Sequence, residues 1–521
     1  MPLRSLFTTC LLFGASLAAC GDPTIYVGKD SDDLTVLCRR EGECGKLMHA
    51  ANKLDLLLVV DNSQSMEQEQ AALAAELPRM MNALLTGDID GDGTPEVAPV
   101  EDINVGVVST DMGLPGLEGV VENCNALGDD GALMTTGGFE MTECSPPTDN
   151  FLHYDADSPR DDAAAELGCL ASLGINGCGF EQQLDAALKA VTPSDSPIEF
   201  LSLGATLVPG GHGDTINAGF LRNDPNDPSL IAVILITDEE DCSSHNLSHF
   251  VPGASPNGLN TRCYYEGQRG AESNLNATKR YVDGLRALRP DHDNLVFFGA
   301  ITGVPPAAVS AGELADVDFA DDAERDAFND DLLAHPDMKE KINDMGTPDV
   351  PEDDGMAPAC KSANGTAYPA RRIVEVARGF GSNSMVQSIC QESFTSAIEP
   401  ILQRMAASFT GACINTVVGR DDDGKVACDV LWRLPAESME GVPESCDDAS
   451  FLSPAGDGRP ANVCRVAQLP SDDGAPEGDG WYYDDFSERT RWCEGDTKQA
   501  IVFSGAATPP AAVTMLIDCA Q

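Results

Sequence analysis

Positive charge is scarce in this sequence. Its 521 residues contain 32 Lys and Arg against 85 Asp and Glu, which gives a formal net charge of −53. An acidic field of this size repels the phosphates of nucleic acids and the headgroups of anionic lipids. We therefore expect no nucleic-acid partner.

Long apolar runs and enzyme motifs are missing as well. Beyond the N-terminal segment, no apolar run reaches the ~18 residues that a transmembrane helix needs. The sequence has no G-x-S-x-G, P-loop or H-E-x-x-H motif, and no G-x-G-x-x-G that opens a helix. His245 and His249 are four residues apart, but the flanking serines and Pro252 favour a loop over a zinc site. We therefore expect that the protein is not an enzyme.

Eighteen cysteines indicate the compartment in which the chain folds. They lack the C-x-x-C spacings of zinc sites, so we interpret them as disulfides formed outside the cytoplasm. Hydrophobic residues make up 42% and charged residues 22%, which are values typical of globular domains. A chain of 521 residues exceeds the usual size of a single hydrophobic core, so we expect at least two domains.

The N-terminus has the features of an export signal. Arg4 precedes an apolar run over residues 6–19 that is too short to span a bilayer. The run ends in Leu-Ala-Ala before Cys20, which resembles the lipobox of bacterial lipoproteins. Residues 1–19 would then be a signal peptide, and Cys20 would carry the lipid. In the alternative interpretation, ordinary cleavage leaves Cys20 free or in a disulfide.

Cysteine parity favours the lipid. Removing Cys10 with the signal and Cys20 with the acyl chains leaves sixteen of the eighteen cysteines, an even number. Two or more acyl chains anchor a protein far better than one. We therefore expect a protein of the bacterial cell envelope that is anchored to the outer membrane, with residues 20–52 as a stalk.

Apolar periodicity predicts alternating strands and helices. The short apolar runs of strands buried on both faces lie at residues 54–60, 103–109, 230–236 and 294–300. Helical spacing is found at residues 67–85, 181–191, 272–288, 370–379 and 394–408. This order predicts an α/β fold with a doubly wound, mostly parallel sheet flanked by helices. The functional site of such a sheet lies at the carboxyl ends of its strands.

The rest of the chain departs from this alternation. Residues 113–168 and 305–360 are rich in Gly and Asp or strongly acidic, and we expect them to be insertions on the rim of a domain over residues 53–408. After residue 409, short strand-like runs separated by turn residues predict a small disulfide-rich β module over residues 409–521. Its six cysteines allow fifteen pairings.

Oxygen-bearing side chains gather at the end of the first predicted strand. Asp61, Ser63 and Ser65 form a D-x-S-x-S pattern directly after that strand. A second carboxylate, Asp238, follows the third predicted strand, whose carboxyl end could lie beside the first in a parallel sheet. Carboxylates and hydroxyls suit a hard divalent cation that keeps several waters. The sequence therefore predicts a metal site on these four residues.

Together the two motifs resemble the von Willebrand factor type A family, over residues 52–408. The metal-ion-dependent adhesion site of that family combines D-x-S-x-S, a threonine, and an aspartate after a later strand. The resemblance implies that Asp61, Ser63 and Ser65 hold Mg²⁺ (or Mn²⁺ or Ca²⁺) directly or through water, and that Asp238 contacts it mainly through water. It also implies a protein ligand whose carboxylate completes the coordination.

The threonine of the family has no direct counterpart. Its pattern T-x-x-x-x-x-L aligns with residues 178–184, where Cys178 stands in the place of the threonine. Thr206 is the second candidate, and Glu181 offers a carboxylate instead. In the alternative interpretation Cys178 pairs with Cys169 and the domain has lost its metal. The motif residues Asp61 and Ser63 would then only cap a helix.

A second acidic loop follows the first predicted helix. It carries carboxylates at positions 1, 3, 5 and 9 and a glycine at position 6, as in the first part of an EF-hand loop. Position 12 is Pro99 instead of glutamate, so the loop resembles the shorter calcium loops of extracellular proteins. The predicted Ca²⁺ ligands are Asp88, Asp90, Asp92, the carbonyl of Thr94, and Glu96. In the alternative interpretation this loop is a solvated turn.

These features favour a lipid-anchored cell-envelope protein that binds a protein ligand through a divalent cation. The alternative is a structural envelope scaffold in which the cation site is degenerate and only stabilises the fold. Both interpretations share the composition and the anchor. Loss of ligand binding on chelation, with the fold intact, would separate them.

Overall fold

The computed structural model describes the larger part of the chain from Tyr26 onward. The described residues are 26–29, 35–40, 43–44, 47–49, 53–93, 100, 102–121, 123–137, 147, 149–155, 158, 160–223, 229–255, 257–290, 295–315, 317, 319, 322–363, 365–406, 412–413, 418–421, 423–435, 446–452, 461–471, 474, 476, 478–486, 499–504 and 514–519. The predicted signal peptide, Cys20, Thr94 and Glu96 lie outside them. No helix in these ranges is long and apolar enough to cross a membrane.

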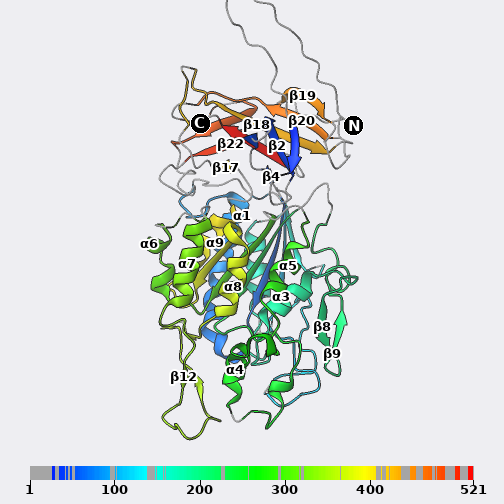
Figure 1. The fold of residues 1–521 in the computed structure, drawn as a ribbon, viewed down its shortest axis with the longest axis vertical. Helices are drawn as coiled ribbons and strands as arrows, with labels where there is room; N and C mark the ends of the chain where they lie inside the picture. The colour runs from blue at the N-terminus through cyan, green and yellow to red at the C-terminus, as the bar shows by residue number, and fades with distance from the viewer. Residues whose placement is uncertain are drawn as a thin grey trace, which may run out of the picture.

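A six-stranded sheet forms the centre of the α/β domain (Figure 1), with strand order β16-β11-β10-β5-β6-β7. Its strands are β5 (Lys53–Val60), β6 (Asp102–Ser109), β7 (Leu152–Asp155), β10 (Leu230–Ile236), β11 (Val296–Thr302) and β16 (Ser384–Ser388). All neighbouring pairs are parallel except β6 and β7. The predicted α/β class with a mostly parallel sheet is therefore confirmed.

Helices cover both faces of this sheet. The helices described in the domain are α1 (Glu67–Thr86), α2 (Arg160–Leu170), α3 (Gln183–Val191), α4 (Arg262–Gly267), α5 (Lys279–Arg286), α6 (Ala311–Ala315), α7 (Asp322–Ala334), α8 (Arg371–Gly379) and α9 (Phe394–Ala406). Alternate residues of β5 point to opposite faces: Leu56 and Leu58 join a core with α1 and α9, whereas Leu57 and Val59 join a core with α3, α5 and α8. Burial on both faces explains why residues 56–60 of β5 are all apolar.

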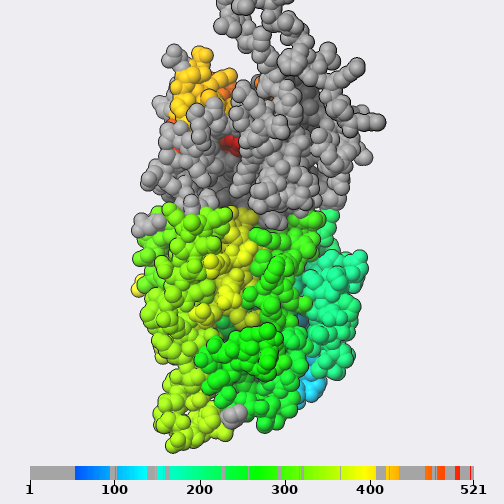
Figure 2. All heavy atoms as spheres, viewed as in Figure 1, coloured from blue at the N-terminus to red at the C-terminus, as the bar shows by residue number. Residues whose placement is uncertain are grey.

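Short hairpins extend from the loops of this domain. They pair β8 (Glu199–Ser202) with β9 (Thr206–Pro209), β12 (Ile342–Asn343) with β13 (Gly355–Met356), and β14 (Cys360–Ser362) with β15 (Gly365–Ala367). The green segment that includes α4 and the yellow-green segment that includes β12 and β13 cover one end of the domain (Figure 2). This end lies away from the C-terminal strands (Figure 1).

Two elements of the domain differ from expectation. Residues 113–168, expected as an insertion on the rim, supply the edge strand β7 and most of α2, which packs against α1. The strand β16 was not predicted either, because its sequence Ser-Met-Val-Gln-Ser lacks a continuous apolar run. It is nevertheless buried along its whole length, since it lies between β11 and the helices α8 and α9.

The described residues of the C-terminal part of the chain include seven strands. These are β17 (Ala412–Cys413), β18 (Cys428–Pro435), β19 (Cys446–Leu452), β20 (Ala461–Val466), β21 (Gly480–Asp484), β22 (Ala500–Ser504) and β23 (Thr514–Cys519). Trp432 and Trp481 are the largest side chains of their separate core. Cys428 and Cys464 are both disulfide-bonded.

The segment expected as a stalk also contributes strands. β1 (Tyr26–Lys29), β2 (Thr35–Arg40) and β3 (Glu43–Cys44) form a small sheet, and β4 (Leu47–His49) pairs antiparallel with β23. The order of the larger C-terminal sheet is β19-β20-β18-β23-β4. Residues from the two ends of the chain therefore share one sheet, and residues 47–49 are not a free stalk.

Candidate metal centre

The two predicted motifs meet at the carboxyl edge of the main sheet. Val60 at the end of β5 lies opposite Ile236 at the end of β10 in the parallel register. The amide of Asp61 continues this pairing by donating to the carbonyl of Ile236 at 2.9 Å. Asp61 and the Thr237-Asp238 pair therefore directly follow neighbouring strands that end at the same edge of the sheet.

Asp61 is fully buried and held in one orientation. Its Oδ1 accepts a hydrogen bond from the amide of Ser63 at 2.8 Å, and its Oδ2 accepts one from the hydroxyl of Thr237 at 2.6 Å. The same hydroxyl accepts from Gln183 Nε2 at 2.8 Å and from the amide of Glu239 at 3.2 Å. The proton of Thr237 therefore points at Asp61, which fixes the carboxylate at the strand end.

The other three predicted metal ligands lie beside Asp61. The Ser63 and Ser65 hydroxyl oxygens are 3.0 Å apart, and Ser65 Oγ donates to Asp238 Oδ1 at 3.2 Å. Asp238 is fully buried, whereas Ser65 is exposed. The structure thus brings Asp61, Ser63, Ser65 and Asp238 together, with Ser65 on the side that solvent reaches.

Further carboxylates crowd the same place. Glu69 on α1 and Glu181 before α3 are almost fully buried, and Glu239 is half-buried. Asp238 Oδ2, Glu69 Oε2 and Glu181 Oε1 have no hydrogen-bond partner among the described residues. Burying an unpaired carboxylate oxygen is costly. Three such atoms lie around one buried aspartate, and carboxylate oxygens of this kind could hold a cation.

The electrostatics of the carboxylates agree with this interpretation. Burial, followed by the charges of Asp61, Glu239 and Glu69, raises the pKa of Asp238 to about 9. Burial is also the largest cause that raises the pKa of Glu239 and of Glu69 to about 7, and Asp61 adds to both shifts. Carboxylates that repel one another can ionise together when a cation lies between them.

A threonine hydroxyl does lie near Asp61, but it belongs to neither of the predicted positions. Thr110, directly after β6, places its hydroxyl 3.5 Å from Asp61 Oδ1, although its sequence context carries no recognised motif. The signal that could have found it is its position one residue beyond a buried strand that pairs with β5. Thr206 lies instead on the exposed strand β9, where its hydroxyl donates to the carbonyl of Leu203.

Cys178 cannot act as a ligand in this structure, because it forms a disulfide with Cys124. The alternative pairing of Cys178 with Cys169 is therefore wrong, although Cys169 is itself disulfide-bonded. The loop around Cys178 remains part of the site, since the amide of Gly177 donates to the carbonyl of Asn62 at 2.8 Å. This loop presents Glu181 to the cluster in place of a hydroxyl.

Gln70 on α1 holds that loop in place. Its amide nitrogen donates to the carbonyls of Asp61 at 2.6 Å and Gly174 at 2.8 Å. Its amide oxygen accepts from the amide of Gly174 at 3.0 Å. One buried side chain thus connects the D-x-S-x-S loop to the segment that carries Glu181, and sequence inspection had not assigned it a role.

The hairpin β14–β15 covers the carboxylates. The amide of Tyr368, just after β15, donates to the carbonyl of Asp238 at 2.8 Å, and the disulfide Cys360–Cys390 ties the hairpin to the end of β16. Gly365, with φ 150°, packs so closely on Glu69 that a Cβ atom would collide with the carboxylate. Only glycine fits this contact.

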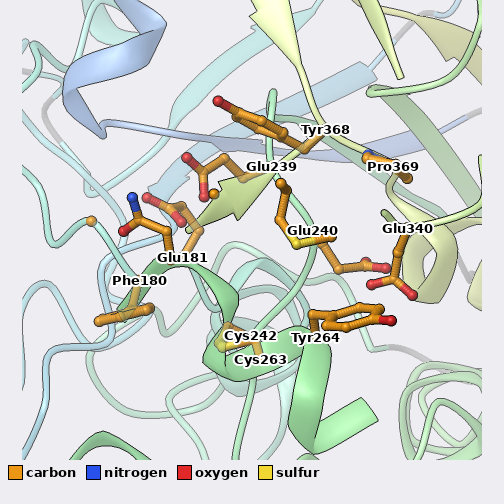
Figure 3. Close-up of a pocket in the computed structure, with 14 residues that line it drawn as sticks. Phe180, Glu181, Glu239, Glu240, Cys242, Cys263, Tyr264, Glu340, Tyr368 and Pro369 are labelled. Carbon is orange, nitrogen blue, oxygen red and sulfur yellow. A yellow bond between two sulfur atoms is a disulfide. The ribbon is translucent and has the colours of Figure 1, made fainter. Parts of the chain in front are cut away.

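A pocket of about 140 Å³ adjoins the carboxylates (Figure 3). Four glutamates line it, and Phe180, Tyr264 and Tyr368 add aromatic walls. The glutamates are Glu181, Glu239, Glu240 and Glu340. Because Glu181 and Glu239 also belong to the carboxylate cluster, the pocket and the candidate metal centre form one continuous acidic region.

The predicted calcium loop brings three of its carboxylates together. Oxygens of Asp88, Asp90 and Asp92 lie within 4.8 Å of one another. Asp88 also accepts hydrogen bonds from the amides of Gly91 at 2.8 Å and Gly93 at 2.9 Å, both of which have positive φ. The loop can therefore present at least three carboxylates to a cation, while Thr94 and Glu96 lie outside the described residues.

The two histidines considered as zinc ligands do not form a site together. His249 is in a short 3₁₀ helix (Ser248–Phe250), where burial lowers its pKa to about 4, and its ring packs at a tilt against the ring of Phe250. Its nitrogen lies near the sulfurs of Cys242 and Cys263, but these two cysteines form a disulfide. The disulfide sulfurs are not thiolates, and thiolates are the form in which cysteine binds metal.

No protein-family model matches the chain. No curated protein matches it either.

Proposed function

We propose that the chain is a lipid-anchored cell-envelope protein whose α/β domain, similar to von Willebrand A domains, binds a protein ligand through a divalent cation. One observation carries the proposal. At the carboxyl edge of the sheet, buried Asp238, Glu69 and Glu181 each hold an oxygen that lacks a partner among the residues described, next to buried Asp61. A cation bound there would compensate Asp238 and Glu69, while Glu181 also lines the adjoining pocket.

The donor set selects the kind of cation. Asp61, Ser63, Ser65 and Asp238 offer only oxygens, and Thr110 adds a further hydroxyl beside Asp61. Hard cations such as Mg²⁺, or Mn²⁺ and Ca²⁺, prefer oxygen ligands, and Mg²⁺ usually keeps several waters. A water on the exposed side, near Ser65, can be exchanged for a carboxylate of the ligand.

The position of the site suits a receptor for ligands. The site lies at the end of the domain that α4 and β12 occupy, whereas β4 and the C-terminal strands lie at the other end (Figure 1). An anchor at Cys20 would reach the domain through β4. The cation and its ligand would then face away from the membrane.

Calorimetry tests the cation site itself. Chelator-treated protein titrated with Mg²⁺ at pH 8 should show a saturable site that Asp61→Ala removes. The Asp90→Ala variant, altered in the acidic loop, should keep it. Heats that are the same for wild type and Asp61→Ala would contradict the proposal.

We also propose that Asp88, Asp90 and Asp92 hold a structural Ca²⁺, together with Thr94 and Glu96. Ca²⁺ at a hundredfold excess over its dissociation constant should stabilise the fold by about 2.7 kcal/mol. Differential scanning calorimetry should show this as a rise in melting temperature that Asp90→Ala reduces. If Asp90→Ala keeps the full rise, the loop is only a solvated turn.

The proposed lipid on Cys20 can be tested directly. Mass spectrometry of the mature N-terminus should find a chain that starts at Cys20 and carries acyl groups. A Cys20→Ser variant should lose its membrane attachment and remain folded. A mature chain that starts elsewhere, or an unmodified Cys20, would rule out the anchor.

A further inference from the structure

The pocket beside the candidate metal centre has two pairs of facing glutamates. Figure 3 shows the carboxylates of Glu181 and Glu239 pointing toward each other, and those of Glu240 and Glu340 doing the same. Each pair is close enough for one charge to raise the pKa of the other. The second pair belongs to neither predicted motif, so the cation site does not explain it.

Two nearby arginines compensate only part of this charge. Arg371 Nε is 3.9 Å from Glu340 Oε2, at the outer limit of an ion pair. Arg372 donates its backbone amide to Glu240, but its guanidinium binds Asp241 at 3.1 Å and the carbonyl of Asn276 at 2.7 Å. Four glutamates therefore face the pocket, and two guanidinium groups, those of Arg371 and Arg372, act on its Glu240–Glu340 pair.

Two further observations indicate a ligand. Glu181 is only 2% exposed and lines the pocket, yet its Oε1 accepts no hydrogen bond from any described residue. The rings of Tyr264 and Tyr368 and the thioether of Met356 form the remaining walls. Aromatic faces attract organic cations but do not ligate hard metal ions. The lining thus favours an organic cation.

We propose that this pocket binds the guanidinium group of an arginine side chain on the protein ligand. The inference rests on the proposed function, since it names a second feature of the same ligand. The pocket of about 140 Å³ is close to the roughly 150 Å³ that accepts a benzene-sized group. A planar guanidinium can donate two parallel hydrogen bonds to a carboxylate and stack on a tyrosine ring.

This arrangement specifies the chemistry of the ligand. A carboxylate of the ligand would bind the cation near Ser65, while an arginine close to it enters the pocket between Glu240 and Glu340. Opposite charges on the ligand would then match a cation and an acidic pocket that lie side by side. Such paired complementarity contributes mainly to specificity.

The experiment uses the full chain and a small probe at pH 8.5, where Glu340, with a pKa of about 7, is ionised. Binding of N-acetyl-L-arginine N-methylamide is measured by ligand-observed NMR titration and compared with the uncharged citrulline analogue. We expect the arginine probe to bind at least tenfold more tightly. Glu340→Gln should weaken it at least fivefold, because the ionised carboxylate of Glu340 is lost.

A matched control separates the pocket from the general acidity of the protein. Asp149→Asn combined with Asp331→Asn removes two exposed charges elsewhere, and the affinity for the probe should change less than twofold. Asp61→Ala should retain probe binding, so failure of the cation site and failure of the pocket can be told apart. Three outcomes would overturn the inference: equal affinity for the arginine and citrulline probes, no effect of Glu340→Gln, or tighter binding of the free diamine putrescine.

Discussion

Asp61→Ala is expected to abolish cation-dependent ligand binding while the domain stays folded. Asp61 is the carboxylate that Ser63, Thr110 and Thr237 orient at the end of β5. Loss of a group that merely orients a metal ligand often lowers metal affinity 10- to 100-fold, so loss of Asp61 itself should cost at least about 100-fold. Removing one of several mutually repelling buried carboxylates should not unfold the domain.

The measurement is capture of ligands from envelope extract with and without chelator, together with a melting curve for each variant. Asp238→Ala should weaken capture in the same way. Asp331→Ala, which removes an exposed carboxylate on α7, should behave as wild type. Equal capture by wild type and Asp61→Ala, with and without chelator, would show that the cation has no role in binding. The scaffold interpretation would then be preferred.

The second large effect is expected on stability. In chelator, the free energy of unfolding should fall as the pH rises from 7 to 9. The folded chain keeps a proton on Asp238, whose pKa is raised to about 9, whereas the unfolded chain releases it near its ordinary value of 3.8. Because the folded state binds one proton more, rising pH favours unfolding by about 1.4 kcal/mol per pH unit. Below pH 7, Glu69 and Glu239 should add to this slope.

Saturating Mg²⁺ should remove most of the slope, because the metal takes the place of the protons. Its affinity should rise about tenfold per pH unit between pH 7 and 9 as one proton is displaced. Denaturant unfolding at several pH values measures the first effect, and Asp238→Asn should flatten the curve without metal. If the slope is the same with and without Mg²⁺, the pH dependence comes from the overall charge of −53 and not from this site.

The residues of the site that could be predicted from the sequence are those that directly follow a strand. Asp61 and Asp238 each follow an apolar run that is buried on both faces, and parallel pairing brings such ends to one edge. Their convergence therefore needs only the fold class. The residues between Asp61 and Ser65 are local to one turn, so their approach follows from sequence spacing.

The rest of the site depends on contacts that spacing does not encode. Thr110 reaches Asp61 because β6 pairs with β5, and nothing near residue 110 indicates this register. Gln70 contacts Gly174 in the segment that leads to Glu181, and this segment is held by the disulfide Cys124–Cys178, a pairing that cysteine counting leaves open. Tyr368 reaches Asp238 from a hairpin 130 residues later in the chain.

The same reasoning applies to the fold. The strands with continuous apolar runs could be predicted, whereas β16 and β7 contain polar residues that find partners only in the folded state. In β7, His153 Nδ1 lies 2.8 Å from Asn104 Oδ1 on β6. The pairing of β4 with β23 joins residues from opposite ends of the chain, which no local pattern predicts.

Anomalous diffraction from crystals of the protein with Mn²⁺ tests the central claim most directly. The account predicts a peak at the carboxyl edge of the sheet, within coordination distance of Asp61 and the Ser63 and Ser65 hydroxyls, and no such peak in Asp61→Ala crystals. A Mn²⁺ peak only at Asp88, Asp90 and Asp92, with none near Asp61, would contradict it.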